Sequence, residues 1–108
     1  MTVDQHLEKI HTFVSRKDVD QYLIGITSNV TARKASYKQT GFDYFELLSE
    51  GHDRDKALAI ERLLFESCIV DKVLQGKYHR DKVNKPYRAS TGGRIANEYS
   101  VYIAGFAP

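Results

Sequence analysis

A strand that passes directly into a helix is the sequence feature that most constrains this chain. Residues 19–27 are rich in β-branched and aromatic side chains, which predicts a strand. Ser28 and Asn29 interrupt it, and Asn29 is well suited to cap a helix that extends to about Gln39. Gly41 then stands where a left-handed residue commonly ends a helix. Such a unit belongs to a domain that builds its core from both strands and helices.

Helix-like and strand-like segments alternate through the rest of the sequence. Val3, Leu7, Ile10 and Val14 recur at helical spacing, so residues 3–15 are predicted to form an amphipathic helix. The further elements that we expect are a strand over 42–48, a turn over 50–53 with Asp53 as a helix cap, a helix over 54–66 that continues after a break over 69–74, and a strand over 98–106. The sequence therefore predicts a small domain of the mixed α/β (α+β) class.

Length and composition limit the remaining choices. A chain of 108 residues with 42% hydrophobic residues suits one domain, residues 1–108, with a modest core. Cys68 is the only cysteine, which excludes an intramolecular disulfide and the usual thiolate zinc site. The start has no leader of basic and apolar residues, and no apolar run approaches the roughly 20 residues that cross a bilayer. We expect a reducing, cytoplasmic location and no membrane partner.

Positive charge is concentrated between residues 72 and 94, where Asp81 is the one acidic residue. Two interpretations stay open: the segment neutralises the phosphates of a nucleic acid, or it is a solvated connection that is basic by chance. The candidate nucleic-acid-binding residues are Lys77, Arg80, Lys82, Lys85, Arg88 and Arg94.

Glu61 occupies an unusual place on the longest predicted helix. The residues three and four positions away on either side are all apolar: Ala57, Leu58, Leu64 and Phe65. The carboxylate therefore projects from the apolar stripe of the helix. A buried carboxylate is costly unless a cation, a metal ion or several donors compensate it, which makes Glu61 a functional candidate. The alternative is that Glu61 reaches past the stripe to a structural arginine or to water.

Arg33 lies one turn before Tyr37, so the two side chains share a face of the helix that Asn29 caps. Anions are favoured near the N-terminus of a helix, and a planar guanidinium there can hold a phosphate through two hydrogen bonds. The alternative is an ordinary surface arginine.

The order of these elements resembles the GIY-YIG nuclease domain. The matching residues are Ile24-Gly-Ile-Thr-Ser-Asn29, then Arg33 and Tyr37, a strand over 41–48, and Ala57-Leu-Ala-Ile-Glu61. The family has a strand ending in Tyr-Ile-Gly-x-Thr, a helix with Arg and often His or Tyr one turn later, and a helix with Ala-Leu-x-x-Glu. The resemblance implies a core at about 19–75, a basic loop at 76–94, and a small central, mainly antiparallel three-stranded sheet.

The function that the resemblance implies is hydrolysis of DNA phosphodiester bonds with one divalent cation, Mg²⁺ or Mn²⁺. Glu61 matches the family's metal ligand, and Arg33 matches the residue that stabilises charge on the phosphate in the transition state. Tyr22 and Tyr37 are the candidate catalytic tyrosines. A hard cation suits a carboxylate with water ligands, so Mg²⁺ is preferred over a soft metal.

The tyrosines of this chain depart from the family pattern. In register with Gly25, Leu23 stands where the second motif tyrosine is expected, and Tyr22 falls one residue early, on the opposite face of the strand. A bulge could turn Tyr22 back. The family's first strand, with Gly-Ile-Tyr, is absent before it.

The final strand offers a second source of a tyrosine. It could pair beside residues 19–27 in a permuted arrangement and bring Tyr99 or Tyr102 to the site. This hypothesis requires one of the two hydroxyls to lie within hydrogen-bonding reach of Arg33 or Glu61.

Three functions remain open at this point. The first is a metal-dependent DNA endonuclease with a tyrosine at an unusual position. The second is a relative that has lost catalysis and binds nucleic acid. The third is a protein-interaction module in which Arg33 and Glu61 are structural. For either DNA function, target choice would come from a protein partner or from a homo-oligomer.

Overall fold

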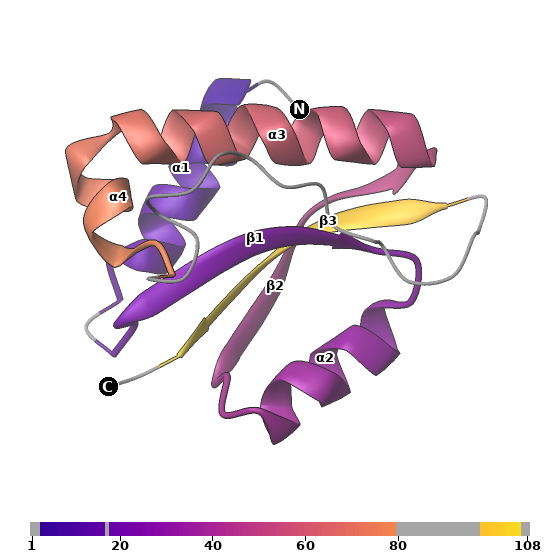
Figure 1. Ribbon diagram of the computed structural model, residues 1–108, viewed down its shortest axis with the longest axis horizontal. Helices are drawn as coiled ribbons and strands as arrows, with labels where there is room; N and C mark the ends of the chain where they lie inside the picture. Colours follow the sequence, from indigo (N-terminus) through magenta and orange to yellow (C-terminus); the bar gives the residue numbers. More distant parts are fainter. Residues whose placement is uncertain (1–2, 17, 80–97, 107–108) are drawn as a thin grey trace.

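The computed structural model describes residues 3–16, 18–79 and 98–106. Helices and strands follow one another in the order α1 (Val3–Val14), β1 (Gln21–Thr27), α2 (Val30–Gln39), β2 (Tyr44–His52), α3 (Arg54–Val70), α4 (Lys72–Lys77) and β3 (Tyr99–Phe106). The predicted α+β class is confirmed: three strands form one antiparallel sheet with helices against it (Figure 1).

The central strand of the sheet is β3, the last strand in the sequence. The order across the sheet is β1-β3-β2, and β3 runs antiparallel to both of its neighbours. Each residue from Gln21 to Thr27 has a partner in β3, without a register shift. β1 and β2, which are close in sequence, therefore do not pair with each other. Both pair with β3, which begins at Tyr99, whereas β2 ends at His52.

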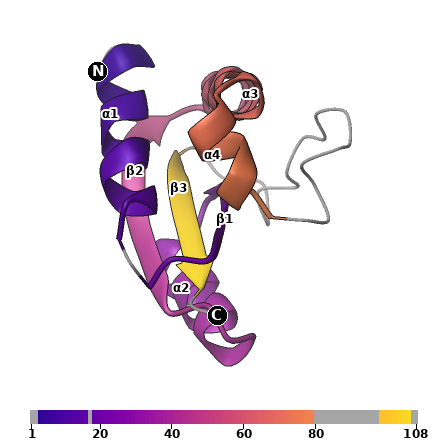
Figure 2. The same cartoon turned by 90° about the vertical axis from the view of Figure 1, so that its left-hand side faces the viewer.

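The helices divide unequally between the two faces of the sheet. α1, α3 and α4 pack above it, and α2 lies below it (Figure 1). The end view shows the same division, with α1 beside β2 (Figure 2). Side chains alternate along each strand, so Tyr22, Ile24 and Ile26 face the three helices while Leu23, Gly25 and Thr27 face α2. Neighbouring residues of one strand, such as Tyr22 and Leu23, therefore lie on opposite faces of the sheet.

Most helix boundaries follow the caps that the sequence predicts. The side chain of Asn29 accepts a hydrogen bond from the backbone N–H of Ala32, at 3.0 Å. Asp53 accepts one from Lys56, at 2.7 Å. Gly41 takes a φ of +93° after α2, the left-handed conformation expected there. These local signals fix where α2 and α3 begin.

The expected turn over 50–53 is wrong, because β2 continues to His52. Its pairing with β3 shifts register between Leu47 and Ser49 and again between Ser49 and His52. Gly51, with a φ of +80°, lies inside this irregular stretch. A glycine with positive φ serves a bulged strand as well as a turn, so the sequence signal did not distinguish the two.

The helical break near residue 66 is also misplaced. α3 runs without interruption to Val70 and the break falls at Asp71. The Asp71 carboxylate accepts hydrogen bonds from the backbone N–H groups of Val73 and Leu74, at 3.0 and 3.1 Å, and so begins α4 at Lys72. The first N–H groups of a helix have no backbone acceptor within that helix, and the Asp71 carboxylate supplies one. The break between α3 and α4 therefore falls at Asp71.

The outer edge of β1 is covered by the residues that follow α4. Tyr78 forms a short parallel bridge with Tyr22, and the backbone N–H of His79 donates to the carbonyl of Tyr22, at 2.8 Å. The Tyr78 hydroxyl accepts from the backbone N–H of Ile24, at 3.3 Å. These bonds satisfy backbone groups that an open sheet edge would leave for another chain.

Two glycines test the packing of the central strand. A Cβ at Gly105 of β3 would lie 2.9 Å from the buried Phe13 ring and 3.2 Å from the carbonyl of Gln21. We expect Gly105→Ala to lower the free energy of unfolding by about 1–3 kcal/mol, because neither neighbour can retreat. Gly76→Ala, in α4, meets nothing within 4 Å and should raise it by about 0.5–1 kcal/mol. Urea denaturation of both variants measures the contrast, and equal effects would contradict it.

Candidate functional site

Two tyrosines meet where α2 crosses the sheet. The hydroxyl oxygens of Tyr37, in α2, and Tyr102, in β3, lie 2.7 Å apart and share a hydrogen bond. Their ring centroids are 5.6 Å apart, and Phe45 of β2 stacks on Tyr102 at 4.9 Å. Tyr102 is 2% exposed, whereas Tyr37 is partly buried. The pair therefore reaches from the centre of the sheet toward the surface of α2.

Gly25 makes the space that the Tyr102 ring occupies. The two residues are direct partners in the pairing of β1 with β3. A Cβ at Gly25 would lie 2.4 Å from the Tyr102 hydroxyl oxygen and 2.6 Å from the ring carbon that carries it. A glycine inside a strand often marks such a close approach. The glycine of the Ile24-Gly-Ile-Thr segment is thus explained by the phenol above it.

Arg33 lies one turn before Tyr37 in α2 and is partly buried. Burial raises the pKa of Tyr102 well above its usual range, and Tyr37 raises it further. The positive charge of Arg33 offsets part of this rise. A tyrosine with an ordinary pKa is already protonated at neutral pH, and the upward net shift extends that protonation further into the alkaline range.

Glu61 is 2% exposed in α3, among the buried side chains of Ala57, Leu64 and Phe65. The predicted placement on the apolar stripe is confirmed. Its negative charge contributes to the raised pKa of both Tyr102 and Tyr78. Glu61 therefore lies within electrostatic range of the tyrosine pair, although it comes from a helix on the other side of the sheet.

Tyr22 is not brought together with Arg33 or Tyr37. Its side chain is fully buried on the three-helix face, and its hydroxyl donates to the carbonyl of Leu74, at 2.9 Å. The bulge that would turn it back is absent from the continuous register between β1 and β3, so that hypothesis is wrong. Tyr22 instead joins α4 to the sheet and packs edge-on against Tyr78, at 4.9 Å between ring centroids.

The final strand does pair beside β1, as the permuted arrangement requires. Tyr102 then faces α2, and Tyr99, three residues earlier, faces the opposite side. The hydrogen bond of Tyr102 goes to Tyr37, not directly to Arg33 or Glu61 as the hypothesis specified. The charge of Arg33 lowers the pKa of Tyr102, and the charge of Glu61 raises it. The signal that could have indicated the contact between Tyr102 and Tyr37 is the pairing of Gly25 with Tyr102, because a glycine leaves room for a large ring from the next strand.

The donor set around Glu61 decides how a metal ion would fit. No group of three or more His, Cys, Asp or Glu side chains suited to a metal occurs within residues 3–16, 18–79 and 98–106. Mg²⁺ commonly binds through one or two carboxylates and completes its shell with water and substrate phosphate. Glu61 supplies a single carboxylate for such an open shell, which water and phosphate reach only when this 2% exposed side chain is uncovered, and the described residues do not fit an all-protein cage.

The candidate nucleic-acid-binding residues fall into two groups. Lys77 is partly buried, and its Nζ donates to the carbonyl of Val14, at 3.0 Å, so it ties α4 to the end of α1. The remaining five candidates lie outside the described residues: Arg80, Lys82, Lys85, Arg88 and Arg94.

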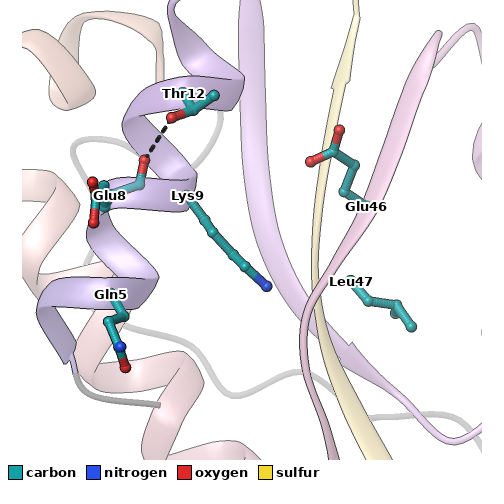
Figure 3. Close-up of a pocket in the computed structure, with 6 residues that line it drawn as sticks. All are labelled: Gln5, Glu8, Lys9, Thr12, Glu46 and Leu47. Carbon is teal, nitrogen blue, oxygen red and sulfur yellow. Dashed lines mark hydrogen bonds between the residues drawn. The ribbon is translucent and has the colours of Figure 1, made fainter.

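A groove lies between α1 and β2, apart from the tyrosine pair. It encloses about 540 Å³ and is lined by Gln5, Glu8, Lys9, Thr12, Glu46 and Leu47. Lys9 extends from α1 toward β2 across this space (Figure 3). Its lining mixes acids with one cation and includes none of the residues that the sequence predicts for the site. We therefore place the candidate site at Tyr102, Tyr37, Arg33 and Glu61.

Comparison with known proteins identifies no relative. No protein-family model, no curated protein and no solved structure matches the chain. In the part of the chain that the structure describes, no helix has the length and apolarity to cross a bilayer.

The hydroxyl pair can be weighed by a double-mutant cycle. We expect Tyr37→Phe and Tyr102→Phe to be less destabilising together than the sum of the two single changes. The coupling should be about 0.5–1.5 kcal/mol, because each single variant leaves one hydroxyl without its partner. Urea denaturation of the four proteins measures it, and strictly additive effects would mean that the bond contributes nothing.

Alkaline pH should destabilise the fold. Burial raises the pKa of Cys68 to about 11, and burial also raises the pKa of Tyr22, Tyr78 and Tyr102. The native state thus binds more protons than the unfolded state once the unfolded groups ionise, near pH 8.5 for Cys and 10 for Tyr.

Stability should therefore be complete below about pH 8.5 and fall above it, by up to about 1.4 kcal/mol per pH unit for each such group. Urea denaturation at pH 8, 9.5 and 10.5 measures the slope. Cys68→Ala should flatten it between pH 8.5 and 10. A wild-type slope of zero would count against these protonation states.

Proposed function

We propose that this protein is a metal-dependent DNA endonuclease in which the central strand supplies the tyrosine that the strand before β1 supplies in GIY-YIG nucleases. The observation that carries the proposal is the 2.7 Å contact between the Tyr102 and Tyr37 hydroxyls, with the charges of Arg33 and Glu61 both acting on Tyr102. The proposal departs from the permuted arrangement expected from the sequence, because the hydrogen bond of Tyr102 goes to Tyr37 and not to Arg33 or Glu61.

The chemistry assigned to each residue follows from its protonation and charge. Tyr102 keeps its proton, so the hydroxyl pair would orient an attacking water by hydrogen bonds instead of acting as a phenolate base. Arg33 would stabilise the negative charge that develops on the phosphate. Glu61 would hold Mg²⁺ or Mn²⁺, which, when bound, polarises the phosphodiester and lowers the pKa of bound water. Tyr22 has no part in this scheme.

DNA is the proposed substrate, and the cytoplasm the proposed location. We assign target choice to a protein partner or to a second copy of the chain.

The burial of Glu61 and Tyr102 favours a second function, nucleic-acid binding without cleavage. Glu61 and Tyr102 are each 2% exposed, and hydrolysis requires water and phosphate to reach them. A protein that binds nucleic acid without cleaving it would keep this arrangement closed. Cleavage experiments separate the two functions.

The decisive measurement is cleavage of supercoiled plasmid and of branched DNA with Mg²⁺ or with EDTA. We expect cleavage with Mg²⁺ alone, and a loss of rate on the order of 10²-fold or more in Arg33→Ala. Tyr102→Phe and Glu61→Gln should also be impaired. Arg62→Ala, an exposed arginine on α3, is the matched control and should cleave normally.

DNA retention without cleavage by the wild-type protein would overturn the endonuclease and favour the binding function. Equal activity of Arg33→Ala and Arg62→Ala would remove Arg33 from the mechanism. Thermal unfolding of each variant shows whether a lost rate reflects a lost fold.

A further inference from the structure

α2 carries positive charge without any acid to balance it. Arg33, Lys34 and Lys38 are its charged residues, and its ten-residue sequence contains neither Asp nor Glu. Ion pairs elsewhere in the described chain join His11 to Asp71, Arg16 to Glu46 and Arg62 to Glu66. Within that same described part, Lys34 and Lys38 belong to no ion pair. Their charges are therefore available to a ligand.

The two lysines are placed as a pair. They are four residues apart and both exposed, so they lie one above the other, about 6 Å apart at their Cβ atoms. Arg33 and Tyr37 each precede one of them, about 100° around the helix, and are partly buried. The lysines thus form an outer row of α2, next to an inner row that leads to the Tyr102 hydroxyl.

We propose that α2 is the docking helix for a nucleic-acid backbone, with Lys34 and Lys38 holding neighbouring phosphates of one strand. Each flexible side chain can reach its own phosphate when one strand runs along the helix, because a nucleic-acid strand repeats its charge at short, regular intervals. A strand held in this way runs along the inner row, which brings a phosphodiester to Arg33. The choice of nucleic acid as ligand rests on the proposed function, and the assignment of the surface rests on α2 itself.

The surface of α2 favours nucleic acid over an anionic membrane. Helices that lie on membranes insert large apolar side chains, such as Trp, Phe or Leu, beside their cations. The exposed apolar residues of α2 are Ala32 and Ala35, which are too small to insert. Tyr37, its one large ring, is directed into the sheet against Phe42, Phe45 and Tyr102. A polyanion with regularly spaced phosphates requires no such insertion.

The attachment of α2 keeps this row in position. The Asn29 cap holds its first turn, and the Tyr37 ring and hydroxyl hold its third. Lys34 lies between the Asn29 cap and Tyr37, and Lys38 follows Tyr37 directly. The helix therefore fixes the position of both lysine backbones relative to Arg33. Removing the two charges should therefore weaken binding without disturbing the fold.

The test is binding of a fluorescein-labelled 20-base-pair DNA duplex in EDTA, measured by fluorescence anisotropy from 50 to 200 mM NaCl. We expect Lys34→Gln/Lys38→Gln to reduce the slope of log K against log salt by about 2, and the affinity by about ten-fold or more at 0.1 M salt. The matched control is Lys56→Gln/Lys72→Gln, which removes the same charge from the exposed surface of α3 and α4, across the sheet.

The outcomes separate cleanly. Equal losses in the two double variants would mean that only net charge matters, and would overturn the docking helix, as would no binding by the wild-type protein. Binding to phosphatidylserine vesicles that depends on Lys34 and Lys38, without binding to DNA, would overturn it in favour of a lipid surface. Selective loss in Lys34→Gln/Lys38→Gln supports it even if Mg²⁺ produces no cleavage, in which case the proposed nuclease activity fails alone.

Discussion

The pairing of β3 with both other strands is the constraint on which the rest of the structure depends. β1 and β2 lie on opposite sides of β3, so the sheet exists only when β3 pairs with both. The side chains of β3 also contribute to both faces of the sheet. Val101 and Ile103 contribute to the core under the three helices, while Tyr102 reaches the opposite face and meets α2. Gly25 and Gly105 show how closely the chain fits around β3, because a methyl group at either would overlap a buried ring.

Signals confined to a few neighbouring residues predicted the fold well. The caps at Asn29 and Asp53, the left-handed Gly41 and the apolar stripe around Glu61 all depend on residues within four positions of one another, and all are confirmed. The end of β2 was wrong because Gly51 serves a bulge as readily as a turn. The tyrosine contact was open because it joins residues 65 positions apart, and neither helical nor strand periodicity contains that information.

The burial of the candidate site limits the access of water and phosphate that the proposed hydrolysis requires. Glu61 and Tyr102 are nearly inaccessible, and the pKa of Tyr102 is raised chiefly because its phenolate would lose hydration. Arg33 offsets part of that cost through its charge, and it is the more exposed of the three groups. The same low dielectric that raises the pKa of Tyr102 strengthens every electrostatic interaction with it. A site of this kind is preorganised before any ligand arrives.

The attachment of α2 has a dynamic consequence. None of its residues is fully buried, and the side chain that packs and hydrogen-bonds against the sheet is Tyr37. Segments with few buried contacts open at a free energy well below that of global unfolding, and their amide hydrogens exchange early. We therefore expect α2 to open before α1, α3 and the sheet. Such an opening would uncover the phenol of Tyr102 for as long as the helix is away, and would return Arg33 to it on closing.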